Sequence, residues 1–217
     1  MLLSRIPRHP SPKATLEQYT IPADVAATML YIAAYMHNDI VEKTVLDMGC
    51  GTGRLALGAA FLGAKRVVGV DIDKEAVKSA FKSAVKLNLK RKVQWVAADI
   101  DVIRGKFDTV LQNPPFGVQK RNADRKFLEK ALETGKKVYS LHKSPVKDAA
   151  LTKRVPTSTS GFIVTNSSSF IKNFVEDKGG RIKVTYTIVM VIPHIFPFHT
   201  KRKHSFLVDL HVIEGCG

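Results

Sequence analysis

The run Asn113-Pro114-Pro115-Phe116 has the residue types needed to hold a planar amine for a reaction at its nitrogen. Two consecutive prolines fix φ and lack backbone donors, so the Asn113 side chain and the Pro114 carbonyl can be held in one geometry. Because the lone pair of a planar amine is delocalised, two acceptors aligned on its hydrogens raise its electron density and aim it. Phe116 would stack on the base that carries the amine. The alternative is a purely structural role, in which the run is a rigid loop followed by an aromatic residue of the core.

A second loop, residues 47–53, has the pattern of a ligand-binding turn. Its alternating glycines, Gly49, Gly51 and Gly53, let the backbone turn sharply and approach a ligand closely. Residues 51–56 also satisfy the dinucleotide pattern G-x-G-x-x-A, so glycine spacing alone does not exclude a nicotinamide enzyme. Asp47 favours S-adenosylmethionine, because a carboxylate before the glycines attracts an ammonium group and repels a pyrophosphate.

Two further carboxylates end later strands of the predicted sheet. Asp71 follows the glycines by about 20 positions, where an acidic residue accepts both ribose hydroxyls. Asp73 is expected to cap the next helix. Asp99 is expected to accept the exocyclic amine of an adenine held between Ile72 and Ile100, rather than to act as a turn residue. Ligands of open parallel sheets bind at the carboxyl ends of strands, where all three site carboxylates are predicted to lie.

The elements that must position these loops alternate between strand and helix. Helices are expected over residues 22–36, 55–62, 74–87, 125–135 and 170–177. Strands are expected over residues 44–48, 66–71, 93–98, 109–112, 137–141, 183–191 and 206–213. Apolar strands separated by helices indicate a parallel sheet covered on both faces, and the last two strands indicate an antiparallel hairpin. We therefore predict a Rossmann-like α/β fold with a seven-stranded, mostly parallel sheet and an antiparallel C-terminal hairpin.

The predicted organisation is one domain over residues 16–217, preceded by a basic arm. Residues 1–15 hold three prolines and three cations without a hydrophobic period, so we expect a mobile or surface-lying segment. Residues 144–169 are rich in Ser and Thr and are expected to form a long loop or insertion.

The composition limits the class of protein. The 34 Lys and Arg against 19 Asp and Glu give a formal net charge of +15, which favours polyanionic partners. The two cysteines, Cys50 and Cys216, cannot build a disulfide framework or a zinc site, so we expect a reducing, cytoplasmic setting. No apolar run reaches about 18 residues, so we expect no membrane span. The chemistry at Asn113 requires no metal.

Taken together, these residues resemble the class I methyltransferases that carry an N-P-P-F/Y motif. Within them, the chain is similar to the ribosomal-RNA adenine-N6 methyltransferases of the methyltransferase-like protein five family. The similarity runs over residues 15–143 and 181–214. It rests on Leu16-Glu17-Gln18-Tyr19, on residues 47–53 and 71–73, on Asn113-Pro114-Pro115-Phe116-Gly117, and on residues 123–125 and 138–143.

The resemblance implies a cofactor, a substrate and a partner. It implies that S-adenosylmethionine is converted to S-adenosylhomocysteine, and it adds Gln18, Thr20 and Thr52 to the cofactor contacts. It also implies a structured region of small-subunit ribosomal RNA as substrate and a small zinc-ribbon activator protein that covers a hydrophobic sheet edge. The arm before Leu16 and the segment 144–169 depart from the family pattern.

Three basic groups lie where RNA would have to be held. They are Lys120-Arg121, Arg125-Lys126 and Lys201-Arg202-Lys203, although each could equally be a solvated charge run. His142 also points toward this edge, but we assign it no chemical role.

Two other functions remain open from the sequence. A protein glutamine methyltransferase also acts on a planar amide nitrogen, but its relatives carry N-P-P-Y, and Phe116 and the net charge of +15 argue against it. A non-catalytic RNA assembly module that binds the cofactor is the other possibility, and the intact Asn113–Phe116 run argues against it.

Overall fold

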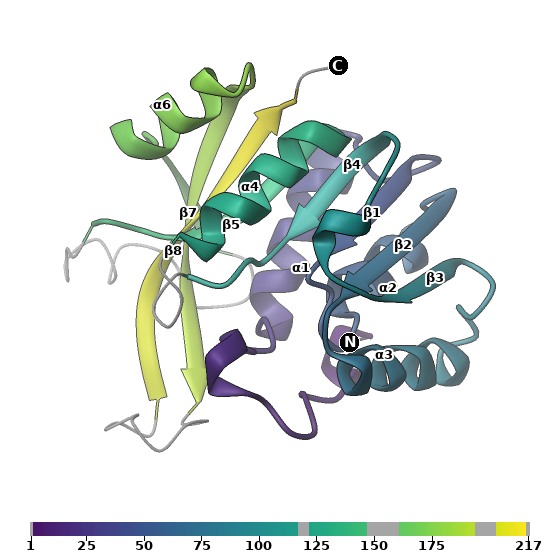
Figure 1. Ribbon diagram of the computed structural model, residues 1–217. Coiled ribbons are helices and arrows are strands. Elements are labelled where there is room, and N and C mark those ends of the chain that lie inside the picture. Colours follow the sequence, from purple (N-terminus) through teal and green to yellow (C-terminus); the bar gives the residue numbers. More distant parts are fainter. Residues whose placement is uncertain (1, 117–121, 147–160, 194–202, 216–217) are drawn as a thin grey trace.

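A single eight-stranded sheet organises the computed structural model, which describes residues 2–116, 122–146, 161–193 and 203–215 (Figure 1). The strands are β1 (Thr44–Met48), β2 (Arg66–Asp71), β3 (Val93–Ala97), β4 (Phe107–Gln112), β5 (Gly135–Lys143), β6 (Phe162–Thr165), β7 (Arg181–Pro193) and β8 (Lys203–Glu214). Their order in the sheet is β3-β2-β1-β4-β5-β8-β7-β6. The five strands from β3 to β5 are parallel, and β8, β7 and β6 join them by antiparallel pairing.

Helices cover both faces of this sheet, and Figure 1 shows α1 and α4 on opposite sides of it. The helices are α1 (Ala23–Tyr31), which continues as a π-helical turn over Ile32–Met36, α2 (Arg54–Phe61), α3 (Lys74–Lys86), α4 (Ala123–Thr134) and α6 (Ser169–Asp177). The side chains of successive strand residues point to opposite faces. Accordingly, Tyr139 packs in the core with α1 and α2, whereas its neighbour Val138 packs in the core with α4 and α6.

The predicted fold class is confirmed, with one strand more than the seven expected. The additional strand, β6, lies within the segment 144–169 that was expected to be a loop or insertion. Its four residues are too short for a clear period-2 pattern, and it forms by pairing with the edge of β7. The ring of Phe162 packs edge-to-face on Tyr186, with ring centroids 5.1 Å apart, and the Oγ1 atoms of Thr165 and Thr187 are hydrogen-bonded at 2.8 Å. Residues 147–160 of the expected loop lie outside the described residues.

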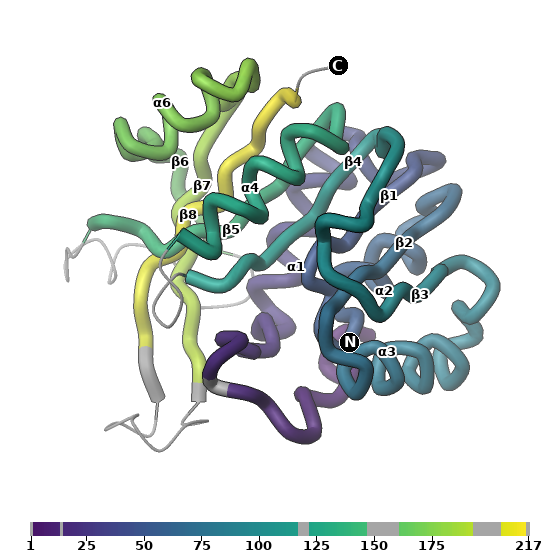
Figure 2. Tube along the Cα trace, in the orientation of Figure 1, coloured from purple at the N-terminus to yellow at the C-terminus, as the bar shows by residue number. Residues whose placement is uncertain are grey.

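The N-terminal segment, expected to be a mobile or surface-lying arm, is partly buried. Leu3 and Ile6 are buried in the core with α1 and α2, and Pro7 accepts a 2.9 Å hydrogen bond from Oγ1 of Thr52. Figure 2 shows this segment as a purple tube that passes the start of α3. Two apolar side chains, Leu3 on a short 3₁₀ turn and Ile6 directly after it, help to anchor the segment, and the prolines conceal that pattern in the sequence. None of the helices in the described part of the chain has the length and apolar character needed to cross a membrane.

Candidate active site

A cavity of about 420 Å³ opens at the carboxyl ends of β1, β2 and β4 and receives most of the predicted site residues. Those that line it are Gln18, Thr20, Asp47, Gly49, Gly51, Thr52, Asp71, Ile72, Asp99, Ile100, Asn113 and Pro115. Gly53, Pro114 and Phe116 are not among its lining residues. Because parallel strands deliver their carboxyl ends to one edge, loops far apart in sequence meet here.

Two glycines of the loop, Gly51 and Gly53, have different structural roles. At Gly51, with φ of 53°, a Cβ would meet no atom within 4 Å, so this backbone borders open space where a ligand can approach. At Gly53, with φ of 83°, a Cβ would lie 2.5 Å from the Trp95 ring. Gly53 therefore allows close packing of the loop against the Trp95 ring, and its predicted cofactor contact stays a prediction.

Asp47 lies at the floor of the cavity with only 1% of its surface exposed. One carboxylate oxygen accepts a 2.8 Å hydrogen bond from the Ala56 amide. Burial raises the pKa of this carboxyl to about 7, and the nearby charge of Asp71 adds to the shift. A ligand cation placed against Asp47 would restore the ionised form, which is the behaviour expected for a carboxylate that receives an ammonium group.

Asp71 is held rigidly by the loops that flank the cavity. Its two oxygens accept from the amides of Gly51, at 2.8 Å, and of Asp73, at 2.9 Å. Burial raises the pKa of Asp71, against the lowering effect of these two bonds. Each carboxylate oxygen has a second lone pair, so the group can still accept hydroxyl donors from the cavity.

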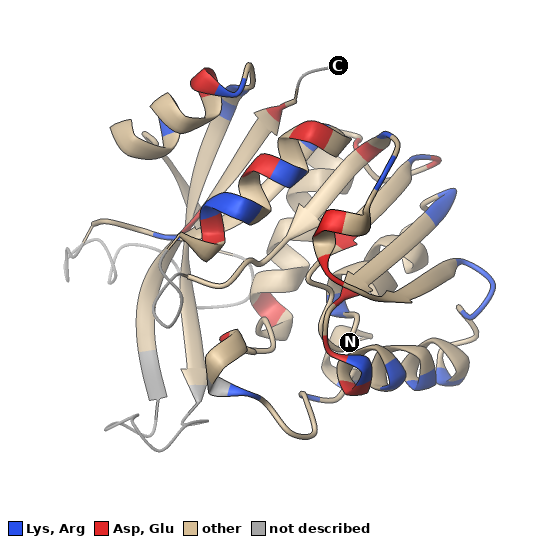
Figure 3. Cartoon of the chain, viewed as in Figure 1, with Lys and Arg blue, Asp and Glu red and all other residues tan. Residues whose placement is uncertain are grey.

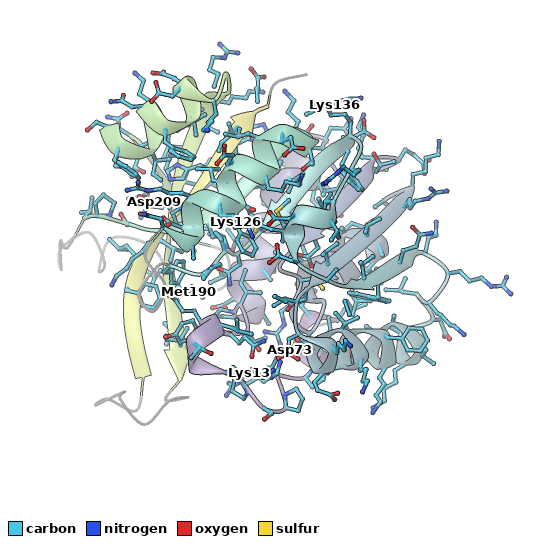
Figure 4. All side chains as sticks on the ribbon, viewed as in Figure 1. Lys13, Asp73, Lys126, Lys136, Met190 and Asp209 are labelled. Carbon is cyan, nitrogen blue, oxygen red and sulfur yellow. The ribbon has the colours of Figure 1, made fainter. Side chains whose placement is uncertain are left out.

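Asp73 begins α3 and also ties down the N-terminal segment. As predicted, it caps the helix by accepting from the Glu75 amide at 2.9 Å. It also accepts from Nε2 of Gln18 at 3.0 Å and lies 3.1 Å from Nζ of Lys13 (Figure 4). Burial opposes ionisation, but the hydrogen bonds from Gln18 and Glu75 and the charge of Lys13 outweigh it and lower the pKa of Asp73 to about 2.

Gln18 and Thr20 line the cavity while their side chains hold the segment before them. Oε1 of Gln18 accepts from the Lys13 amide at 2.8 Å, and Oγ1 of Thr20 accepts from the His9 amide at 3.1 Å. The N-terminal segment thus forms a wall of the cavity, to which it contributes His9 and residues 15–21. Polar residues of this kind carry no periodic signal, so only the family resemblance pointed to Gln18 and Thr20, and nothing pointed to His9.

Asp99 departs from its predicted role in part. It lines the cavity, but it also accepts from the Asp101 amide at 3.0 Å and so caps the 3₁₀ turn Ile100–Val102, the turn role that the sequence prediction disfavours. Nζ of Lys126 lies 3.0 Å from Asp99 and 2.8 Å from Asp101. Lys126, expected to hold RNA, is therefore bound to two carboxylates, and its position on α4 is labelled in Figure 4.

Asn113 lines the cavity, and its side chain carries a buried acceptor without a partner in the described part of the chain. Its Oδ1 is buried and has no hydrogen-bond partner within the described residues, although the side chain lines the cavity. A buried carbonyl oxygen without a partner costs about 1–3 kcal/mol, so a donor that reached this atom would stabilise it. The residue before it, Gln112, is anchored through a 2.8 Å bond from Nε2 to Oγ of Ser140.

Phe116 is placed differently from our prediction. Its amide donates to Oε2 of Glu17 at 2.8 Å, and its ring packs edge-to-face on Phe206 with centroids 5.9 Å apart. One contact of the Phe116 ring is therefore already taken by Phe206, and Phe116 is not among the lining residues of the cavity. Gly117, which follows it, and the basic group at Lys120-Arg121 lie outside the described residues.

His142 belongs to a buried polar chain rather than to the cavity. Nε2 of its ring lies 2.7 Å from Oγ of Ser140, and burial lowers the pKa of this histidine to about 4. The ring is therefore neutral at physiological pH and packs 5.4 Å from the His211 ring. These contacts give His142 a packing role, and the sequence assigned it no chemical role.

Comparisons with known proteins match this geometry. Residues 23–140 match the family model described as the methyltransferase small domain. The rRNA N6-adenosine-methyltransferase Mettl5 of Drosophila melanogaster is 40% identical, over 94% of this chain and 88% of its own. An uncharacterized protein of Methanocaldococcus jannaschii is 41% identical, over 100% of this chain and 93% of its own.

A solved structure extends the similarity to three dimensions. The crystal structure of a candidate RNA methyltransferase from Pyrococcus horikoshii superposes with a TM-score of 0.81 at 33% identity. It covers 99% of this chain and 95% of that chain. The similarity therefore includes the antiparallel strands β6 to β8 as well as the segment that the family model matches.

Proposed function

We propose, from the premise that this chain belongs to the rRNA N6-adenosine-methyltransferase family that includes Mettl5, that it methylates N6 of an adenine in small-subunit ribosomal RNA. The chain is an S-adenosylmethionine-dependent methyltransferase, as its family and fold show. The observation that supports the acceptor is the buried, unpaired Oδ1 of Asn113 in the wall of the cavity that also holds Asp47 and Asp71. A single methyltransferase domain is part of this proposal, and the burial of Leu3 and Ile6 in its core extends it beyond the start expected at residue 16.

The residues of the cavity suit S-adenosylmethionine. Asp47 would receive the ammonium group, Asp71 the ribose hydroxyls, and Ile72 and Ile100 the faces of the adenine. The open space at Gly51 leaves room for the methionine part of the molecule. When bound, the cofactor supplies a methyl group made electrophilic by the positive sulfonium. No cluster of three or more metal-binding side chains occurs in the described residues, and the chemistry proposed here uses none.

Asn113 would orient the acceptor amine. Its Oδ1 would accept one N6 hydrogen and the Pro114 carbonyl the other, which turns the nitrogen lone pair toward the methyl carbon. The new N–C bond forms as the S–C bond breaks, and the extra proton on nitrogen then leaves to water. Such a reaction needs alignment more than a strong base. The buried His142, which does not line the cavity, is held neutral by burial.

Phe116 would stack on the extruded base only after its ring leaves Phe206. The edge-to-face contact between these rings is worth about 0.5–1.5 kcal/mol, which stacking on a base at about 1–3 kcal/mol can replace. The stacking role therefore stays a proposal that includes a movement of this side chain.

The partner implied by the resemblance would cover an edge of the sheet. In the described residues the sheet ends at β3 and β6, and Val164 on β6 is 67% exposed. We propose a small zinc-ribbon protein as an activator, to be tested by co-expression and by the activity of the purified pair.

A direct experiment separates the proposed acceptor from the glutamine alternative. The purified chain is given labelled S-adenosylmethionine with either small-subunit ribosomal RNA or a translation release factor. We expect label in the RNA as N6-methyladenosine and none in the protein. Label in the release factor alone would overturn the proposed acceptor, and label in neither substrate, with the activator supplied, would favour the non-catalytic assembly module.

A further inference from the structure

Helix α3 carries a row of lysines along its outer surface. Lys74, Lys78, Lys82 and Lys86 follow one another at every fourth position and all four are exposed. Residues one helical turn apart lie on the same face, so the row extends over about 18 Å. Lys90, Arg91 and Lys92 continue it into β3, and Figure 3 shows the blue bands along α3 and the loop after it.

Almost no negative charge balances this surface. Glu75 is the only acidic residue between Lys74 and Lys92, against seven cations. It forms a 2.8 Å ion pair with Lys78. Among the described residues, no salt bridge joins Lys74, Lys82 or Lys86 to a carboxylate. The surface therefore contributes six of the net fifteen positive charges of the chain.

The row is unfavourable for the helix that carries it. Like charges four residues apart destabilise a helix by about 0.2–0.5 kcal/mol per pair, and Lys74 lies at the positive end of the helix dipole. The buried face of α3, with Ala76, Val77, Ala80 and Ala84, is what holds the helix to the sheet. A polyanion bound along the row would remove the repulsion, so its binding and the stability of α3 are coupled.

The row begins at the rim of the cavity. Lys74 directly follows Asp73, which accepts from Gln18 in the cavity wall. The cavity itself is lined by four acidic residues, Glu17, Asp47, Asp71 and Asp99. Its two cations, Arg54 and Lys126, are already bonded within the protein, so the cavity is unfavourable for phosphate. Cations outside the cavity are therefore better placed to hold an RNA strand.

The basic residues near the reactive loop are less available for that task. Lys126 is bound to two carboxylates, and the guanidinium of Arg125 lies 4.5 Å from the centre of the Phe170 ring. On α3, by contrast, Phe81 is 42% exposed beside the lysines, with Nζ of Lys90 5.6 Å from its ring centre. An aromatic among cations offers a surface for a base or sugar in addition to phosphate contacts.

We propose that this surface, defined as Lys74, Lys78, Lys82, Lys86, Lys90, Arg91 and Lys92 with Phe81, binds the phosphate backbone of the RNA whose adenine enters the cavity. The inference rests on the proposed function for the identity of the RNA. A membrane is a poorer partner, because an interfacial helix needs a broad apolar face, and Phe81 and Val85 are the large apolar side chains exposed on α3.

The test compares two double substitutions in the full chain. Lys82→Gln with Lys86→Gln removes two charges from the row, and Gln is nearly as good a helix former as Lys. Lys65→Gln with Arg66→Gln is the control, because it removes two exposed charges at the amino end of β2, opposite the cavity edge. Binding to small-subunit ribosomal RNA transcribed in vitro is measured at several salt concentrations, together with methyl transfer and cofactor affinity.

We expect the row variant to bind RNA about tenfold more weakly near 0.1 M salt, with a salt dependence lower by about 1.5 in the log–log slope, and the control to bind nearly as the wild type. The KM for RNA should rise, whereas kcat, cofactor affinity and Tm should not fall. Equal weakening in both variants, or wild-type binding by the row variant, would overturn the proposal. Loss of binding to phosphatidylserine vesicles without loss of RNA binding would also overturn it. A last outcome separates the two proposals. If the wild type does not methylate RNA, but the row variant binds RNA more weakly than the wild type does, the docking surface stands and the proposed acceptor fails.

Discussion

Nη2 of Arg54 donates a 2.7 Å hydrogen bond to the carbonyl oxygen of Ile6, which lies 48 positions earlier in the chain. The same buried guanidinium donates through Nη1 to the carbonyl oxygen of Ile21. Between these two anchors lie His9, Gln18 and Thr20, which form part of the cavity wall. One side chain at the start of α2 thus fixes both ends of the segment that forms this wall of the cavity.

Replacing this side chain should loosen that wall. In Arg54→Leu, two buried carbonyl oxygens lose their donor, so we expect the free energy of unfolding to fall by about 2–4 kcal/mol. The affinity for S-adenosylhomocysteine should fall by about tenfold or more, whereas kcat at saturating cofactor should change less. Urea denaturation and isothermal titration calorimetry measure the two effects.

Two variants control this prediction. Arg66→Leu removes an exposed arginine and should leave both quantities unchanged. Arg54→Lys keeps the charge but offers no fork of donors, so it should show an intermediate loss. Cofactor affinity at the wild-type level in Arg54→Leu would show that the N-terminal segment holds its place by other contacts.

Asn113→Ala should abolish methyl transfer and leave cofactor affinity within a few-fold. The reason is that its buried, unpaired Oδ1 is available to the acceptor amine rather than committed to the fold. Single-turnover methylation and calorimetric titration with S-adenosylhomocysteine give the two quantities. Turnover that persists in this variant would rule out the acceptor-orienting role.

Asp71→Ala should act mainly on the cofactor. We expect a loss of about 1.5–3 kcal/mol in binding free energy for the charge-assisted bonds to the ribose. The substitution also frees the Gly51 amide, so part of the loss could come from a looser glycine loop. Asp71→Asn keeps an acceptor for that amide, and a comparable loss in both variants would assign the effect to the ligand. Unaltered affinity in both would remove Asp71 from the ribose site.

Cofactor affinity should depend on pH through Asp47, whose pKa is raised to about 7 by burial. In the free protein the carboxyl is protonated below that pH, and the ligand ammonium requires it ionised. Binding therefore releases a proton, and affinity should rise with pH, by up to about tenfold per unit between about pH 5.5 and 7. The same shift makes the free protein less stable as pH rises from the ordinary carboxyl pKa to about 7.

The Asp47→Asn variant checks this assignment. Asparagine cannot ionise, so the pH dependence of affinity should become much flatter, and the affinity near pH 7.5 should be lower than that of the wild type. Calorimetry in buffers of different ionisation enthalpy counts the proton released. An unchanged pH profile in Asp47→Asn would assign the titration to another group, and Asp71, whose pKa burial also raises, is the first to test.

Several features of this protein were determined by the sequence itself. The local hydrophobic period predicts the strands and helices. The last residues of parallel strands all lie at the same edge of the sheet. The sequence alone therefore predicts that Asp47, Asp71 and Asn113 lie in one site. The cap at Asp73 is equally local, since its carboxylate bonds the Glu75 amide two residues away.

Other features were decided only by the tertiary structure. The burial of Leu3 and Ile6 depends on a guanidinium at position 54, and β6 depends on the free edge of β7, so neither has a local signal. Whether Gly53 faces a ligand or the Trp95 ring, and whether Asp99 is free or bonded by Lys126, is likewise settled by partners far away in sequence. The sequence specifies which groups occupy the edge of the sheet through short-range periodicity. Long-range packing then decides which of them remain free to meet a ligand, because each side chain bonds the nearest complementary group in space.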